Sequence, residues 1–418
     1  MMKNDIKNFD IIISGGGLSG CLMALSLSTL TKADGRLLSI AIVEANASPQ
    51  QLTQQNEQPK GTMPLFDERV LALSHGSAAY LAELNAWQHL SSAACPIEKI
   101  DISDRGHYGK ARLEAQAHGV AALGYVISMA AIGKGLLQEL ATKNNIHWFS
   151  PDKISTIIWQ SENDTKTVHV ELNSTQTLTA NLLLACDGAN SPCRQLAGIQ
   201  VNHSDYQQVA LIANVATEKP HHNKAFERFT EFGPIAMLPL SSLKHENRCS
   251  LVWTMTPEQS ETMLALNDAQ FNKQLEHAFG RWLGEITYVG KRDVYPLVLL
   301  QAQQQTYHRM ALIGNASHAI HPIAGQGFNL GLRDVKLMAN LIAKAVNTNQ
   351  DIGCFSLLTH YEQQRRQDQQ QVITLTDSLV TLFSNDLPPL VIGRNIALKV
   401  MNYVSPIKNT LVNKFMGY

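Results

Sequence analysis

The sequence lacks long apolar runs, a signal-peptide pattern and an excess of either charge. No stretch reaches the ~20 apolar residues that a helix needs to span a bilayer, and the N-terminus runs from polar residues straight into a glycine-rich turn. The formal net charge is −1, so nothing in the overall charge favours a nucleic-acid partner. We therefore expect a cytoplasmic protein that does not bind nucleic acid.

Paired cysteines are also missing. The six cysteines are scattered, none forms a C-x-x-C pair, and no histidine spacing completes a zinc site. Cys186 and Cys193 are separated by a predicted helical turn, which favours two buried structural thiols over a redox pair. We expect reduced, intracellular thiols and no metal site.

The patterns along the chain indicate an α/β fold. A length of 418 residues suggests two or three domains. A β-branched run at 11–13, a helical periodicity after it and an apolar run at 38–43 form a βαβ unit. From about 206 to 297 the runs become β-like, and 309–317 returns to a buried-strand pattern. We expect a discontinuous Rossmann-like domain with an inserted, mainly antiparallel β domain.

The first motif is a glycine-rich turn. Gly15, Gly17 and Gly20 fit G-x-G-x-x-G, in which the glycines allow a tight turn, the approach of a pyrophosphate and close packing of helix on strand. The helix N-terminus offers free N–H groups and partial positive charge. Glu44, at the end of the second strand, is placed to accept hydrogen bonds from a ribose. The alternative is a turn without a ligand, and the motif does not distinguish NAD from FAD.

The second motif is "LLLACDGANSPCR", residues 182–194. An apolar strand runs into Asp187 and Gly188, after which Ser191 can cap a short helix with Pro192 at its first position. The alternative interpretation is an ordinary connection between a strand and a helix.

The third motif is "LIGNASHAIHPIAGQGFNLGLRDV", residues 312–335. It predicts a buried strand, Asn315 where the chain leaves that strand, a loop and a helix. Gly325, Gln326 and Gly327 would assemble a helix N-terminus whose N–H groups are little obstructed by side chains. An anionic or electron-rich group, such as a reduced isoalloxazine, should bind there.

These motifs, in this order and at these distances, resemble the FAD-dependent aromatic hydroxylases, the family that includes p-hydroxybenzoate hydroxylase. The resemblance covers nearly the whole chain. The segments similar to its ubiquinone-biosynthesis branch are "FDERVLALSHGSAAYL" (66–81), "ISDRGHYGK" (102–110), "ALGYVI" (122–127), "DYQQVALIANV" (205–215) and "HPIAGQGFNLGLRDV" (321–335).

The resemblance implies FAD as the cofactor. Gly15, Gly17 and Gly20 would hold its pyrophosphate and Glu44 its adenosine ribose, and Arg69 would contact the cofactor.

The resemblance also implies roles for the other two motifs. Asp187 and Gly188 resemble the second fingerprint, associated with FAD and the pyridine nucleotide. The third fingerprint usually reads Gly-Asp, with the Asp on the ribityl chain. Here Asn315 keeps an acceptor oxygen without the charge, so flavin binding should survive with a changed local potential. The methoxyphenol hydroxylases of the branch share this Asn. The residues expected along the flavin ring are Pro322, Gly325, Gln326 and Gly327.

The implied organisation has three regions. The FAD-binding domain would comprise 1–97, 128–202 and 298–345, the substrate domain 98–127 and 203–297, and a C-terminal helical region 346–418.

The implied activity is hydroxylation of a polyprenylated phenol, of the 2-polyprenyl-6-methoxyphenol type, in ubiquinone biosynthesis. NADPH or NADH would reduce FAD, and O2 would be captured as a C4a-hydroperoxyflavin that transfers one oxygen. The protein must keep this site dry, and the apolar "GPIAMLPL" (233–240) suits either its wall or plain sheet core. A phenol reacts better as phenolate. His318 and His321 are candidates for removing its proton, but hydrogen bonds that stabilise the loop are an equally open interpretation.

The C-terminal segment 387–418 contains four basic residues, no acidic one and many apolar ones. This composition is typical of a helix on an anionic membrane surface, where a polyprenyl phenol would be delivered. The alternative is a helix packed on the body of the protein. A ubiquinone-biosynthesis complex is a further expected partner.

Three other functions compete with this one. A flavin-dependent disulfide or prenyl reductase is one, although no redox cysteine pair or second dinucleotide-binding βαβ unit is visible. A sister hydroxylase of the same family is another. The third is an inactive flavin-binding assembly subunit, which Asn315 leaves open.

Overall fold

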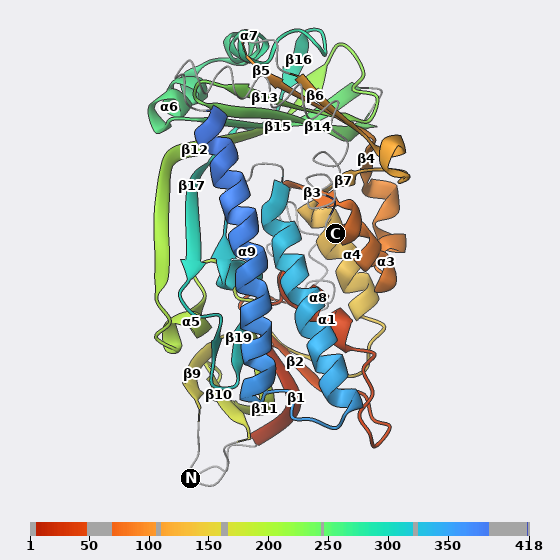
Figure 1. The fold of residues 1–418 in the computed structure, drawn as a ribbon, viewed down its shortest axis with the longest axis vertical. Coiled ribbons are helices and arrows are strands. Elements are labelled where there is room, and N and C mark those ends of the chain that lie inside the picture. The colour runs from red at the N-terminus through yellow and green to blue at the C-terminus, as the bar shows by residue number, and fades with distance from the viewer. Residues whose placement is uncertain are drawn as a thin grey trace.

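A computed structural model describes residues 6–47, 69–105, 110–159, 166–243, 246–320, 325–383 and Met416. Within these residues, two large sheets and a small third sheet form the framework (Figure 1). The first large sheet lies in the lower half of the view, behind long helices, and the second forms most of the upper part.

The first sheet has the strand order β18–β19–β11–β1–β2–β8, with β10 and β9 added beside β11. Its strands are β1 (Ile6–Ser14), β2 (Ile40–Val43), β8 (Ile146–Phe149), β9 (Ile154–Ile158), β10 (Val168–Leu172), β11 (Thr177–Ala185), β18 (Thr306–Tyr307) and β19 (Met310–Leu312). β1 pairs in parallel with β11 on one side and β2 on the other. Residues 11–13 are therefore fully buried, which explains their continuous β-branched run.

Helices cover this sheet. They are α1 (Leu18–Leu27), α3 (His75–Glu83), α4 (Met129–Leu140), α8 (Gln326–Asn347) and α9 (Phe355–Phe383), with the short α5 (Pro192–Leu196) after β11. α1 packs between α4 and α8, and all its residues except Ser19 are buried. A helix buried all round has no polar face. This central position fixes where the β1–α1 turn lies.

The second sheet has the order β20–β17–β12–β15–β14–β13–β5–β6, with β16 beside β12. Its strands are β5 (Lys99–Asp104), β6 (Lys110–Glu114), β12 (Val201–Thr217), β13 (Lys224–Thr230), β14 (Gly233–Leu243), β15 (Glu246–Met255), β16 (Ile286–Val289), β17 (Asp293–Ala302) and β20 (His318–Ala319). Its neighbours pair antiparallel except β13 with β5. The helices α6 (Pro257–Ala265) and α7 (Asp268–Phe279) cover the outer face.

A third, small sheet lies between the two large ones. It consists of β3 (Val70–Ser74), β7 (Gly124–Ser128) and β4 (Cys95–Ile97), and short 3₁₀ turns complete the described elements: Trp87–His89, Ser91–Ala93, Ala115–His118 and Gly314–Ala316. Val70 of β3 packs against a cluster that contains Leu240 of β14 and Val126 of β7. β3 therefore links the second sheet to the helical side of the molecule.

The predicted fold class is confirmed. The first sheet is parallel at its centre, the second sheet is mainly antiparallel, and α8 and α9 follow. The proposed boundaries at 203 and 297 fall inside β12 and β17, which continue down beside the first sheet (Figure 1). The predicted tail 387–418 lies outside the described residues apart from Met416. Among described helices, none is long and apolar enough to cross a membrane.

Candidate functional site

The turn between β1 and α1 requires glycine at two positions. Gly15 has a φ of +96°, and a Cβ there would lie 2.6 Å from the carbonyl oxygen of Cys186. A Cβ on Gly20 would overlap the carbonyl oxygen of Gly15. A Cβ on Gly17 would meet no other described segment within 4 Å. Two of the predicted glycines thus close the turn, and the third leaves open space above it.

Helix α1 begins at this open side. Its N-cap is Gly17, and no side chain in the described part of the chain caps the first-turn N–H groups. Free N–H groups and the helix dipole give this end partial positive charge. The turn therefore has both the room and the polarity for a pyrophosphate, which is the fit expected of a dinucleotide cofactor.

Glu44 follows β2 and shapes the same turn. Its Oε2 accepts a hydrogen bond from the backbone N–H of Gly16 at 2.7 Å. Its Oε1 accepts from the backbone N–H and the side-chain amide of Asn46, at 2.8 and 2.9 Å. The residue is 6% exposed. A carboxylate oxygen accepts more than one hydrogen bond, so these contacts leave the predicted ribose contact open and add a structural role.

Asp187 lies beneath the glycine turn. Its Oδ2 accepts from the backbone N–H of Cys193 at 3.0 Å and from Ser14 Oγ at 3.4 Å. Its Oδ1 is buried and has no partner among the described residues. A buried acceptor without a partner costs about 1–3 kcal/mol, so this oxygen suits a donor from a ligand. Gly188 follows with a φ of +82°.

The interpretation of Cys186 and Cys193 as buried thiols is confirmed. Both are free and buried. Burial, together with the nearby Asp187, raises the pKa of each thiol well above its ordinary value. Protonated, inaccessible thiols do not take part in redox exchange. The predicted Ser191 cap is also present, accepting from the N–H of Arg194 at 3.0 Å.

Arg194 joins the second motif to the third. Its guanidinium donates to the carbonyl oxygen of Ala316 at 2.8 Å and to that of Ala189 at 2.7 Å. Only 5% of the residue is exposed. Sequence reasoning missed this residue, because a basic side chain in a short helix gives no sign that it turns inward.

The third motif packs directly on the first. Gly314 has a φ of +62°, and a Cβ on it would lie 2.9 Å from Ser19 Oγ in the first turn of α1. On the other side Gly314 lies against Gly331 of α8. The next residue, Asn315, is exposed. The chain thus brings Asn315 near the start of α1 while its amide stays available to a ligand.

His318, a predicted candidate for proton transfer, is buried with its side chain 0% exposed. Its Nε2 lies 2.9 Å from Asp334 Oδ2, which also accepts from the N–H of Gly314 at 2.8 Å. Asp334 Oδ1 accepts from Arg365 Nε at 2.5 Å. We call His318, Asp334 and Arg365 the buried triad. It ties the third motif to α8 and α9, which favours the loop-stabilising interpretation of His318.

The charge of Asp334 is maintained by its partners. Burial alone would raise its pKa, but Arg365, His318 and the N–H of Gly314 together hold that pKa below its ordinary value. Burial would lower the pKa of Arg365, whereas the carboxylates of Asp334 and Asp368 raise it. The triad is therefore an ionised pair inside the protein, with the imidazole as a third member. Sequence reasoning missed Asp334 and Arg365.

The N-terminus of α8 is held against β3. Gly325 is the N-cap, with a φ of +62° and no side-chain cap. Asn329, 1% exposed, accepts from the N–H of Ser74 at 2.9 Å and donates to the carbonyl oxygens of Ala72 and Gly325 at 2.8 and 2.7 Å. Its amide therefore fixes the direction in which the first N–H groups of α8 point.

The remaining predicted residues divide by what is described. Gln326 is 5% exposed, whereas a Cβ on Gly327 would meet only Ile320, at 4.0 Å. Arg69 lies just before β3, with its guanidinium carbon 5.1 Å from the centre of the Tyr295 ring in β17. His321 and Pro322 lie outside the described residues.

The inner face of the second sheet carries a row of side chains in register across five strands. Each of them is partly accessible. The row consists of Ile102, Glu227, Ala236, Val252 and Ile212. In "GPIAMLPL", Ile235 and Met237 belong to the core on the outer face, and Ala236 and Leu238 face inward. Ile235 and Met237 are therefore sheet core, as one interpretation expected, whereas Ala236 and Leu238 remain candidates for the wall of a substrate site.

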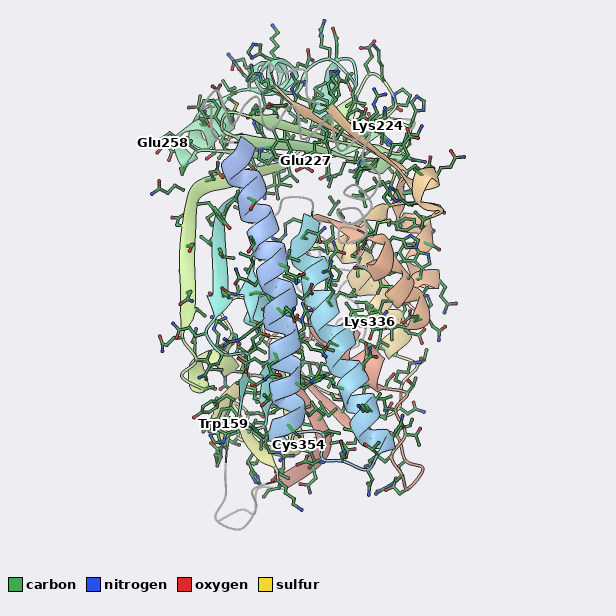
Figure 2. All side chains as sticks on the ribbon, viewed as in Figure 1. Trp159, Lys224, Glu227, Glu258, Lys336 and Cys354 are labelled. Atoms are coloured by element: carbon green, nitrogen blue, oxygen red, sulfur yellow. The ribbon has the colours of Figure 1, made fainter. Side chains whose placement is uncertain are left out.

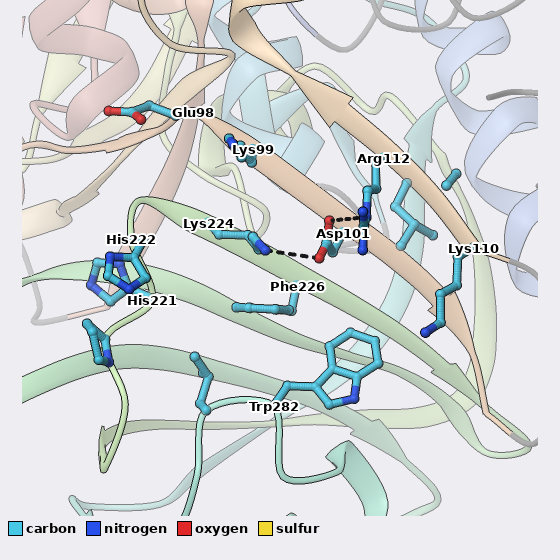
Figure 3. Close-up of a pocket in the computed structure, with 14 residues that line it drawn as sticks. Glu98, Lys99, Asp101, Lys110, Arg112, His221, His222, Lys224, Phe226 and Trp282 are labelled. Carbon is cyan, nitrogen blue, oxygen red and sulfur yellow. Dashed lines mark ion pairs between the residues drawn. The ribbon is translucent and has the colours of Figure 1, made fainter. Parts of the chain in front are cut away.

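A cavity of about 640 Å³ lies elsewhere, on the outer side of the second sheet (Figure 3). Lys224 Nζ and Arg112 Nε each pair with Asp101, at 3.2 and 3.4 Å. Phe226, in the core beneath α7, and Trp282 also line it. This cavity contains none of the described residues predicted for the site, so it is not the region of the glycine turns.

Comparisons with known proteins identify the family of the chain. The family model described as "FAD binding domain" matches residues 8–376. The chain is 31% identical to ubiquinone hydroxylase UbiL of Rhodospirillum rubrum, over 98% of this chain and 90% of that protein. It is 28% identical to 3-demethoxyubiquinol 3-hydroxylase of Escherichia coli, over 98% of each.

A solved structure shares the fold. p-Nitrophenol 4-monooxygenase PnpA from Pseudomonas putida superposes with a TM-score of 0.75 at 17% identity, over 98% of this chain and 99% of that chain. The chain therefore belongs to the FAD-dependent aromatic monooxygenases, in the branch that contains these ubiquinone hydroxylases.

Proposed function

We propose that the protein hydroxylates a polyprenylated phenol, of the 2-polyprenyl-6-methoxyphenol type, in ubiquinone biosynthesis. The observation that carries the proposal is the inward-facing row of the second sheet, apolar except for Glu227, in a chain whose relatives are named as ubiquinone hydroxylases. An apolar wall suits a prenylated ring and excludes water from the reacting atoms.

Three groups of residues would hold FAD. Gly15, Gly17 and Gly20 would accommodate the pyrophosphate at the start of α1, with Glu44 at the ribose. FAD, when bound, supplies the two-electron chemistry and the activation of O2.

The middle and ring of the cofactor would meet the other motifs. Asp187 has a free buried oxygen and Asn315 an exposed amide, and both are close to the glycine turn through Cys186 and Ser19. Gly325 would direct backbone N–H groups toward an electron-rich ring. Arg69, beside Tyr295, would close the site from the second sheet.

A sister hydroxylase in the same pathway is the second candidate. The Escherichia coli relative, named for a different quinol, is 28% identical over the whole length. Asn315 in place of the usual Asp favours the methoxyphenol substrate, since the resemblance associates that Asn with the methoxyphenol hydroxylases.

The donor and location complete the proposal. We propose NADPH or NADH as the electron donor, and a cytoplasmic protein whose C-terminal segment binds the membrane surface or a ubiquinone-biosynthesis complex. Deleting residues after 385 should then abolish sedimentation with anionic liposomes while FAD content is retained. Unchanged sedimentation would contradict the membrane contact.

The test of function is anaerobic reduction of the FAD-loaded protein by NADPH or NADH, followed by oxygen. Short-chain 2-prenyl-6-methoxyphenol and the matching 3-demethoxyubiquinol are added in parallel, and products are identified by mass spectrometry. Product from the first alone supports the proposal, and product from the second alone supports the sister activity. Flavin binding without product from any phenol would leave the assembly-subunit hypothesis.

A further inference from the structure

Glu227 is the charged member of the inward-facing row. On β13, Phe226 and Arg228 point to the outer side, where both lie against Trp282, at 5.8 and 5.5 Å from its ring centre. Ala225 packs on the inner side against residues of β4 and β7. By strand alternation Glu227 also points inward, toward the ends of α8 and α9 (Figure 2).

The surroundings of Glu227 are apolar. Its neighbours in register are Ile102 on β5 and Ala236 on β14. Among the described residues its carboxylate has no hydrogen-bond or ion-pair partner, and the side chain is partly accessible. Burial raises its pKa from 4.5 to about 7. A carboxylate that is surrounded by protein yet still reached by solvent borders an internal space.

Glu227 is connected by contacts to the α8 N-terminus. Leu238, two residues along β14 from Ala236, packs in the same cluster as Val70 of β3. Ala72 lies two residues after Val70 on β3, and a Cβ added to Gly325 would be only 2.8 Å from the Cβ of Ala72. Because Val70 and Ala72 lie on the same face of β3, the row of Glu227 and the helix end proposed for the flavin ring border the same region.

We propose that Glu227 accepts the proton of the substrate's phenolic hydroxyl and serves as the acid–base residue of the hydroxylation. The inference rests on the proposed function. The phenol O–H bond breaks, a carboxylic acid O–H bond forms on Glu227, and the electron pair stays on the phenolate oxygen, which activates the ring. After oxygen transfer that oxygen again accepts a proton, and Glu227 returns it.

The position and chemistry of Glu227 suit this role. A general base is most effective when its pKa lies near the working pH, and an unpaired carboxylate in an apolar wall is a common property of functional sites. The titratable groups on the same face are Asp104, Arg248, Asp293, Tyr295 and Arg69. Burial is the sole cause of the raised pKa, so none of these groups acts strongly on Glu227.

The test compares Glu227→Gln with wild type. Gln keeps the size of the side chain and cannot accept the proton. Glu231→Gln, an exposed carboxylate in the β13–β14 turn, is the matched control. Product from 2-prenyl-6-methoxyphenol is measured from about pH 6 to about pH 10, the range between a raised Glu pKa and that of a free phenol. FAD content and melting temperature confirm that each variant is folded.

We expect wild-type product formation to fall as pH decreases below about 7, because protonated Glu227 cannot accept a proton. At neutral pH Glu227→Gln should lose about 10²–10⁴-fold and recover toward pH 10, where the phenol ionises unaided. Glu227→Asp should be intermediate, and Glu231→Gln unchanged.

Two results would overturn the inference. One is a folded Glu227→Gln with the wild-type rate and pH profile, and the other is a loss that does not recover at high pH. If wild type itself makes no product from any phenol, the proposed function fails and this inference fails with it.

Discussion

Removing the charge of Glu227 should stabilise the protein above neutral pH. Burial raises the pKa of this carboxyl from 4.5 to about 7, so the folded state binds its proton more tightly than the unfolded state does. The stability that the protonated form contributes is complete below about pH 4.5 and is lost as the pH rises through about 7. Glu227→Gln, neutral throughout, does not undergo this loss.

The magnitude follows from the same pKa. At about 1.4 kcal/mol per pH unit, the ionised carboxylate would lower the free energy of unfolding by about 3 kcal/mol at pH 8. The side chain is partly accessible, so we reduce this to about 2 kcal/mol. Urea unfolding of apo wild type, Glu227→Gln and the exposed control Glu231→Gln would be measured at pH 5 and pH 8.

The variant's gain in stability over wild type should be small at pH 5 and about 2 kcal/mol at pH 8. A gain that is equal at both pH values would refute the reasoning, because it would arise from packing and not from ionisation. A loss at pH 8 would show that the carboxylate is well paired in the folded protein. Proteins commonly sacrifice stability in this way at functional sites.

Four further predictions concern the three sequence motifs. Asp334→Asn leaves Arg365 buried without its charge partner, so we expect a loss of about 3–5 kcal/mol in urea unfolding. Gly20→Ala should prevent stable folding, because its Cβ overlaps a backbone oxygen. Gly17→Ala should fold normally but bind FAD more weakly in a fluorescence titration, since it fills the open side of the turn. Asn315→Asp should retain FAD and lower its midpoint potential, because a negative charge disfavours added electrons.

Each of these has a result that would contradict it; for Gly20→Ala it is a folded protein with the wild-type melting temperature. Asp368→Asn, which also removes a partner of Arg365 but at a partly exposed position, should cost less than about 1 kcal/mol. Equal losses of unfolding free energy in Asp334→Asn and Asp368→Asn would show that burial of the Asp334–Arg365 pair makes no difference. Full FAD affinity in Gly17→Ala would move the pyrophosphate away from this turn. An unchanged potential in Asn315→Asp would place its side chain away from the flavin.

The parts of the site that could be predicted are those encoded by neighbouring residues. Gly15 and Gly20 are required by contacts within one turn, and the cap of Ser191 on Arg194 spans three residues. Such local signals predicted the fold class, the glycine turn of the first motif and the helix cap of the second. Residues 321–324, in the middle of the third motif, lie outside the described part of the chain.

The parts that could not be predicted depend on distant segments. Asp334 and Arg365 are ordinary charged residues in two helices until the packing of α8 against α9 joins them. Asn329 reads as a polar helix position, although it binds β3 across more than 250 residues of sequence. Glu227 alternates with Phe226 as any half-exposed strand does. This face becomes an interior one because β3, β4 and β7 pack beneath the second sheet, and those strands are distant from β13 in the sequence.

The alternation along β14 has a consequence for how such an enzyme can diverge. Ile235 and Met237 hold the outer core, whereas Ala236 and Leu238 line the inner face. Side chains that hold the core and those proposed to line the substrate site thus occupy separate positions of one strand. A lineage can exchange the second set for larger, smaller or polar residues without disturbing the first, so new ring substituents can be accommodated while the framework is inherited unchanged.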